Sequence, residues 1–173
     1  MKLLKLLFLT IIILLQSVYA DIPYLTLKQL TENSDYIITG KVIDVYSKVE
    51  LRNNRQIVYT FVTVSCNGCL KGNKTADNIT IKMIGGKTPE FIYMPEDFIR
   101  FEKNESVILF LKKGDNNVWK IPSLSGKISI IEQAGIKTAD CSYLRGLDIS
   151  DQKMQKYLTV CEIQSKILKY SGK

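Results

Sequence analysis

The chain has 173 residues, of which 24 are Lys or Arg and 17 are Asp or Glu, so its formal net charge is +7. A positive charge favours anionic partners, but the lysines are spread along the chain without a run of five or six, so we do not expect nucleic acid as the partner. The absence of histidine excludes a Ser-His-Asp or Cys-His catalytic constellation, a His-ligated metal site and an imidazole general base. We therefore expect a protein that is not an enzyme and uses no metal and no cofactor.

The first 20 residues have the pattern of a cleavable signal peptide. Lys2 and Lys5 provide a positive start, residues 6–15 are almost wholly apolar, and Val18 and Ala20 suit the positions three and one residues before a cleavage site. A membrane anchor is the alternative interpretation, but the apolar stretch is shorter than the roughly 20 residues that span a bilayer, and no basic stop-transfer cluster follows it. The sequence thus predicts a secreted or periplasmic protein whose mature chain contains no membrane span.

The mature chain has the length of one domain, which we divide into a β domain at residues 21–135 and a helical extension at residues 136–173. A short helix is predicted at 26–33, where Leu27 and Leu30 have helical spacing. Runs rich in Val, Ile, Tyr and Phe then predict strands at 36–46, 56–66, 78–84, 106–112, 119–121 and 127–131.

Two of these predicted strands carry further signals. Gly40 lies inside the first strand, where a glycine often marks a bulge or a sharp bend. In the fourth strand, residues 107–111 form a continuous apolar run, which predicts burial on both faces of the sheet.

The last third of the chain predicts an amphipathic helix. Ser150 is a suitable N-cap, and apolar residues recur at helical spacing through Lys169, at Met154, Leu158, Val160, Cys161, Ile163, Ile167 and Leu168. A helix lying on a membrane surface is the alternative, given four lysines in the same segment. A cysteine in the middle of the helix favours packing on the β domain.

The order of elements predicts a mainly β fold: a five-stranded OB-like barrel with a short N-terminal helix and a C-terminal amphipathic helix. An immunoglobulin-like sandwich would need about seven strands and usually a cysteine pair around a buried Trp. Trp119 has no such flanking pair.

Four short segments resemble a group of small exported bacterial proteins with OB-like folds and no assigned function. The segments are an acidic residue followed by Tyr-Ile-Ile-Thr-Gly-Lys-Val at 35–42, a Tyr-Thr strand at 59–64, Leu-Lys-Gly at 70–72, and Asn-Glu-Ser-Val-Ile-Leu-Phe-Leu at 104–111, where the recurring pattern begins with Gly-Glu. The order is more distantly similar to the N-terminal barrel of netrin-like domains and tissue inhibitors of metalloproteinases. Those inhibitors present an N-terminal cysteine to zinc, whereas the mature chain would begin at Asp21, so that mechanism does not carry over.

Four cysteines in an exported chain predict two disulfides. We favour Cys66 with Cys69, across a turn predicted at Asn67-Gly68, and Cys141 with Cys161. A bridge between Cys66 and Cys161 stays open as an alternative. The Cys66-x-x-Cys69 spacing could also serve redox chemistry, but such pairs normally lie at the N-terminus of a helix. A four-cysteine zinc site is weaker again, because only one such pair is present.

The predicted binding surface combines aromatic residues with a lysine. OB barrels commonly bind ligands on the second and third strands and the flanking loops. This surface would consist of Tyr59, Phe61, Lys82, Phe91, Tyr93 and Met94, the last three on an irregular segment at 87–97. The alternative is that Phe61 is simply covered by that segment or by the C-terminal helix. The sequence predicts an exported, non-enzymatic binding module for a protein or glycan, with a periplasmic thiol-disulfide oxidoreductase as the alternative.

Overall fold

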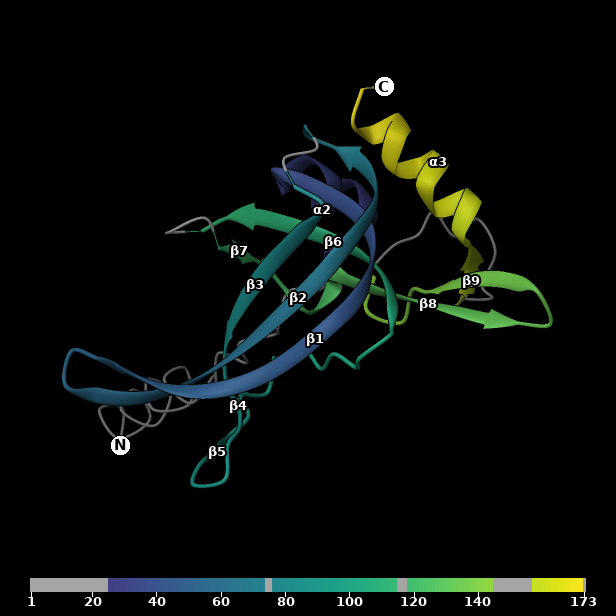
Figure 1. Ribbon diagram of the computed structural model, residues 1–173. Helices are drawn as coiled ribbons and strands as arrows, with labels where there is room; N and C mark the ends of the chain where they lie inside the picture. The colour runs from purple at the N-terminus through teal and green to yellow at the C-terminus, as the bar shows by residue number, and fades with distance from the viewer. Residues whose placement is uncertain (1–24, 74–75, 115–117, 145–156, 173) are drawn as a thin grey trace, which may run out of the picture.

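A computed structural model describes residues 25–73, 76–114, 118–144 and 157–172. Within these ranges the protein is mainly β, with an eight-stranded sheet, a separate two-stranded sheet and two α-helices (Figure 1). The elements are α2 (Leu27–Asn33), β1 (Tyr36–Arg52), β2 (Arg55–Lys71), β3 (Asn78–Ile84), β4 (Gly86–Lys87), β5 (Ile92–Tyr93), β6 (Ser106–Lys113), β7 (Trp119–Lys120), η2 (Leu124–Gly126), β8 (Lys127–Gln133), β9 (Ile136–Asp140), β10 (Tyr157–Thr159) and α3 (Val160–Tyr170). The predicted signal peptide at residues 1–20 lies outside the described residues.

Helix α2 forms where its leucine spacing predicts a helix. Thr26 caps it, because the Thr26 hydroxyl accepts a hydrogen bond from the Gln29 backbone N–H at 3.1 Å while the Gln29 side chain accepts one from the Thr26 N–H at 2.9 Å. Leu27 and Leu30 are buried against the sheet. The cap and the buried face together fix this helix on the β domain.

Strands β1 and β2 form one long antiparallel hairpin, and both extend beyond their predicted bounds. Its turn residues, Asn53 and Asn54, have φ of 50° and 59°, the left-handed conformation that a two-residue turn in a twisted hairpin needs. Of the bulge or bend predicted at Gly40, the pairing shows a register shift between Thr39 and Gly40, as a bulge produces. A Cβ on Gly40 would lie 2.6 Å from the Ser65 carbonyl oxygen, so no other residue fits there without movement of the backbone.

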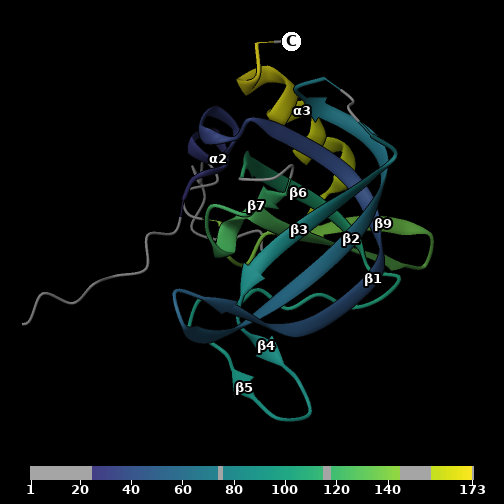
Figure 2. The same ribbon diagram turned by 60° about the vertical axis from the view of Figure 1, so that its left-hand side comes forward.

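Strand β1 pairs on both of its edges. It pairs with β2 along its length, and residues 36–41 also pair with β6 in antiparallel fashion. On the other side of β2 lies β3, which pairs in parallel with β7 at a single position, Ile81 opposite Trp119. Because β7 also pairs with β6, the pairings lead from β1 through β2, β3, β7 and β6 back to β1. Figure 2 shows the strong curvature of this sheet.

The main sheet has more strands than the five predicted. β8 pairs with β6, β9 pairs with β8, and β10 pairs with β9, which adds three strands beyond β6. Two of them, β9 and β10, come from the segment 136–173 that the sequence predicted to be helical. The alternation of apolar and polar residues is short in this segment. A three-residue strand such as β10 is too short to show the two-residue period of a strand.

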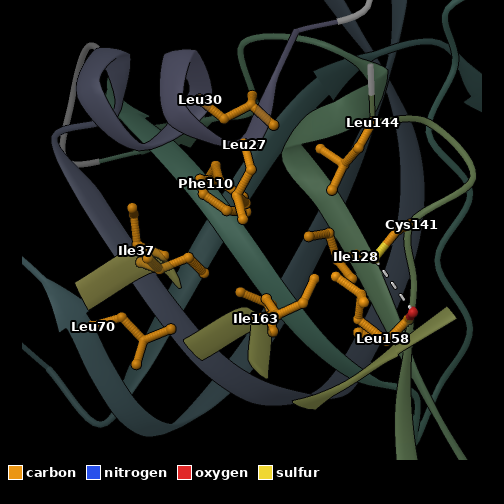
Figure 3. Packing of buried hydrophobic residues seen from close by; sticks show 13 residues of the cluster. Leu27, Leu30, Ile37, Leu70, Phe110, Ile128, Cys141, Leu144, Leu158 and Ile163 are labelled. Carbon is orange, nitrogen blue, oxygen red and sulfur yellow. Dashed lines mark hydrogen bonds between the residues drawn. The ribbon is translucent and has the colours of Figure 1, made fainter. Parts of the chain in front are cut away.

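Strand β6 separates two hydrophobic clusters, so its predicted burial on both faces is confirmed. The inner core contains every second residue of β6 together with residues of β1, β2 and β3: Tyr36, Ile38, Val42, Val62, Val64, Ile79, Ile81, Val107, Leu109 and Leu111. The helix-side core contains the alternate β6 residues and both helices: Leu27, Leu30, Ile37, Leu70, Ile108, Phe110, Ile128, Ala139, Cys141, Leu144, Leu158, Ile163 and Ile167. Figure 3 shows the helix-side core.

Helix α3 begins later than the sequence predicted. The expected N-cap, Ser150, lies outside the described residues, and Leu158 lies in β10 opposite Ala139 rather than in the helix. Thr159 is the observed N-cap and forms a capping box with Glu162, which explains why the helix starts at Val160. In the described part of the chain, neither helix is long and apolar enough to cross a membrane.

Candidate functional site

A cleft of about 790 Å³ lies beside the C-terminal ends of β1 and β3. These strand ends, and the β4–β5 hairpin next to them, are at the opposite end of the molecule from α2 and α3 (Figures 1 and 2). The walls of the cleft come from the end of β1, from β3, from the segment after β5 and from β7. The lining residues are Glu50, Leu51, Arg52, Tyr59, Lys82, Met83, Ile84, Tyr93, Pro95, Asp97, Phe98, Ile99, Val118, Lys120 and Ile121.

The cleft lies beside the point where the parallel pairing of β3 with β7 ends. β3 and β7 are bridged at Ile81 and Trp119 and at no other position among the described residues. Past this bridge, Met83 and Ile84 of β3 and Ile121 after β7 all line the cleft. The edge of β3 beyond Ile81 therefore lies at the cleft.

Aromatic rings and lysines cover the outer face of β1, β2 and β3 beside the cleft; we call Tyr46, Lys48, Tyr59, Phe61 and Lys82 the platform. The rings of Tyr46 and Phe61 stack with centroids 5.2 Å apart and an interplanar angle of 11°. Lys82 Nζ lies 3.9 Å from the Tyr59 ring centroid, and Lys48 Nζ lies 4.7 Å from that of Phe61. Tyr59 and Phe61 are consequently buried, with 5% and 8% of their surface exposed. Phe61 is therefore covered, but by Tyr46 and the two lysine side chains rather than by the 87–97 segment or the C-terminal helix.

One carboxylate holds the two platform lysines in place. Glu50 Oε1 lies 2.9 Å from Lys48 Nζ, and Glu50 Oε2 forms an ion pair with Lys82 Nζ. Hydrogen bonds from Lys82 and then Lys48 lower the pKa of Glu50 below its ordinary value, and the hydrogen bond to Glu50 raises the pKa of Lys48. Glu50 is therefore negatively charged at neutral pH. Its single negative charge forms ion pairs with both Lys48 and Lys82.

The β4–β5 hairpin projects from the body of the molecule on the far side from the helices (Figures 1 and 2). At its base, Gly86 has φ of 137° and packs so closely that a Cβ would lie 2.3 Å from the Thr60 hydroxyl oxygen. Farther along, the Thr88 N–H donates to the Phe91 carbonyl at 2.8 Å, and the Phe91 N–H donates to the Thr88 hydroxyl at 3.0 Å. The hairpin is thus fixed at its base and closed by its own hydrogen bonds.

The apolar residues of this hairpin are exposed. The exposed fractions are 42% for Phe91, 66% for Ile92, 52% for Tyr93 and 46% for Met94. Burial of Phe91, Tyr93 and Met94 would have removed the reason to expect a binding surface there. Their exposure leaves that expectation standing.

The structure brings together only part of the predicted surface. Tyr59, Lys82 and Tyr93 line the cleft, and Phe61 supports Lys82 from the platform. Phe91 and Met94 do not line the cleft.

Three residues of the site were not predicted from the sequence. Glu50 positions Lys82, and Leu51 and Ile84 are 71% and 53% exposed at the cleft. A leucine two residues before the Asn53-Asn54 turn was the available signal for Leu51, because a hairpin end has little core to cover it.

The four cysteines all lie among the described residues, and none is joined in a disulfide in the structure. The turn predicted at Asn67-Gly68 is instead an irregularity within β2, which continues to Lys71. Three residues of extended strand span roughly 10 Å, more than the Cα separation of about 7 Å that a disulfide allows. A bridge between Cys66 and Cys69 would therefore require β2 to bend.

The thiol environments give the oxidoreductase alternative no support. Cys69 donates to the carbonyls of Lys71 and Gly72, both at 3.3 Å, from within a strand rather than from the start of a helix. Cys141 is buried in the helix-side core and donates to the Ala139 carbonyl at 3.4 Å (Figure 3). Burial raises the pKa of the Cys141 thiol to about 11. Within the described ranges, no three Cys, Asp or Glu side chains come together in a way that could hold a metal ion.

No protein-family model matches the sequence, and no curated protein matches it.

Proposed function

We propose that this protein is an exported, non-enzymatic binding module, and that a macromolecular partner outside the cytoplasm binds across the cleft and the β4–β5 hairpin. The observation that carries the proposal is the gathering of exposed apolar side chains at one end of the molecule: Leu51, Ile84, Phe91, Ile92, Tyr93 and Met94. Soluble proteins seldom expose such a patch unless it contacts a partner.

A protein fits this surface better than a glycan does. Sugars stack on aromatic faces, but four of the six exposed side chains are aliphatic or methionine, and Tyr59 and Phe61 are covered. Protein interfaces use aliphatic, aromatic and methionine side chains together at their centre. The charged residues Arg52, Lys82 and Asp97 around the cleft suit the polar rim of such an interface.

We also propose that the fold is an OB-like barrel and that the protein is exported. An OB-like barrel is supported by the pairing of β1 with β6 and of β3 with β7, and OB barrels bind ligands on this part of the sheet. Export is supported by the signal-peptide pattern of residues 1–20.

The proposal is tested by capture of partners from native envelope or culture fluid with wild-type protein and a Phe91→Ser, Tyr93→Ser double variant. A matched control, Ile136→Ser with Leu168→Ser, removes two exposed apolar side chains elsewhere. We expect a protease-sensitive partner that the wild type and the control retain and the double variant loses. Equal recovery of every partner by all three forms would overturn the proposal.

A further inference from the structure

The edge of β3 that faces the cleft carries backbone groups that the sheet does not use. One edge of β3 pairs with β2 from Asn78 to Ile84, whereas the other edge, among the described residues, pairs with β7 at Ile81 alone. Lys82, Met83 and Ile84 all line the cleft. Because residues along a strand direct their N–H and C=O groups to the two edges in turn, this segment offers donors and acceptors to a polypeptide lying in the cleft.

The wall of the cleft has an excess of positive charge. Lys48 and Lys82 share the single carboxylate of Glu50, so one of their two charges is uncompensated. Arg52 and Lys120 add two further positive charges to the lining of the cleft, against one further negative charge from Asp97. Lys82 keeps 28% of its side-chain surface exposed, so an incoming group can reach it. An acidic side chain therefore complements this wall.

The neighbouring side chains define what would flank that acidic residue. Lys82 and Ile84 lie on one face of β3, opposite Phe61 and Tyr59 of β2, and Met83 lies on the other face. A strand added beside β3 would place one residue opposite each of them. The complementary order is an acidic residue opposite Lys82 and apolar residues opposite Met83 and Ile84.

We propose that the cleft binds an extended acidic peptide segment of its protein partner, which adds a strand to β3 and places a carboxylate against Lys82 and Arg52. This mode combines main-chain hydrogen bonds with side-chain selection. It rests on the proposed binding function and specifies how the partner is recognised.

The test uses a fluorescent peptide, Gly-Ser-Glu-Val-Val-Glu-Ser-Gly, whose Glu-Val-Val order is the same from either end. We expect saturable binding by anisotropy that weakens as salt is added, with NMR shift changes at the amides of Lys82, Met83 and Ile84. Two control peptides separate the contribution of charge from that of main-chain hydrogen bonds. One replaces both Glu residues by Lys, and the other carries N-methyl groups on both Val residues. Since neighbouring residues point to opposite edges, one of these N-methyl groups faces β3 in either register.

Charge-reversed variants of the protein complete the test. Lys82→Glu and Arg52→Glu should each weaken peptide binding about tenfold or more, equivalent to about 1.4 kcal/mol. Lys41→Glu makes the same change in net charge on an exposed residue outside the cleft and should leave binding unchanged. The Arg52 variant keeps the test valid if Lys82→Glu fails to fold, because Arg52 is exposed at the end of β1.

Three results would overturn the proposal. They are equal binding of the N-methylated peptide, equal binding of the lysine peptide, and shift changes at β3 caused by polygalacturonate but not by the acidic peptide. If the peptide fails while the Phe91→Ser, Tyr93→Ser variant still loses a partner, strand addition is wrong and the binding module stands.

Discussion

The two halves of β1 lie in contrasting surroundings. Residues 36–41 pair with β2 on one edge and β6 on the other, and their side chains supply both hydrophobic cores. From Asp44 to Arg52 the strand pairs with β2 only, and its side chains are mostly half-buried or exposed. One continuous strand thus belongs to the most buried part of the protein at one end and to the candidate binding surface at the other.

This contrast indicates how the fold separates stability from binding. The helix-side core and the inner core lie on the two faces of β6, and the inner core reaches the floor of the cleft through Met83 and Ile121, which are partly buried. Toward the ends of β1 and β3, ion pairs and ring contacts replace this core, and Leu51 and Ile84 are exposed. Substitutions at the two ends should therefore change different properties.

The largest expected effect comes from the buried end. Phe110 is fully buried in the helix-side core, and Phe110→Ala should lower the free energy of unfolding by about 3–5 kcal/mol because it leaves a cavity. Ile84→Ala, at a residue that is 53% exposed beside the cleft, should change it by about 0.5 kcal/mol or less. Urea denaturation of the two variants measures both values, and similar losses of stability would contradict the separation of the two ends.

A smaller effect is expected at the base of the β4–β5 hairpin. Gly86→Ala places a Cβ 2.3 Å from the Thr60 hydroxyl oxygen and 2.4 Å from that of Ser47, at φ of 137°. We expect a cost of about 3 kcal/mol from strain and crowding combined, with faster amide exchange confined to the hairpin. Gly135→Ala is the matched control, since its φ is 79° but no atom lies within 4 Å of the added Cβ, so about 1 kcal/mol is expected. Equal costs would show that crowding at Gly86 is unimportant.

The smallest effect concerns acidification of the cleft end. Because the folded-state pKa of Glu50 lies below its ordinary value of 4.5, the ion pairs contribute their full stability above pH 4.5. This contribution is lost as the pH falls from 4.5 through the lower folded-state value. The stability difference between wild type and Glu50→Gln should therefore shrink in that range, while the carboxyl NMR titration of Glu50 shows the lowered midpoint. A midpoint at or above 4.5 would contradict the ion-pair geometry.

Much of the fold could be predicted from the sequence, because its strands repeat apolar residues over long stretches. The bounds of β3 and the two-sided burial of β6 follow directly from such runs. Asn104 has φ of 72°, a left-handed conformation that asparagine tolerates, at the place where the resembling pattern has glycine. The strands β9 and β10 were missed because pairing, rather than local pattern, forms them.

The candidate site was harder to predict than the fold. The exposure of Phe91, Tyr93 and Met94 could be expected, because these apolar residues lie in a segment that has neither a helix nor a strand pattern. The covering of Phe61 did not, because it depends on the β1–β2 register that brings Tyr46 opposite that ring. The role of Glu50 in the site likewise depends on the contact between the end of β1 and β3. The sequence of neither segment alone reveals that contact.

The burial of Cys141 has a consequence for when this thiol can react. A thiol with a pKa near 11 is ionised in only about one molecule in ten thousand at pH 7, and the thiolate is the reactive form. Any reaction that needs the Cys141 thiolate is therefore strongly suppressed once the helix-side core has closed around this side chain. Alkylation of Cys141 should therefore be much slower in the folded protein than in the unfolded chain. A measurement of reduced thiols therefore includes Cys141 reliably only after the protein has been unfolded in denaturant.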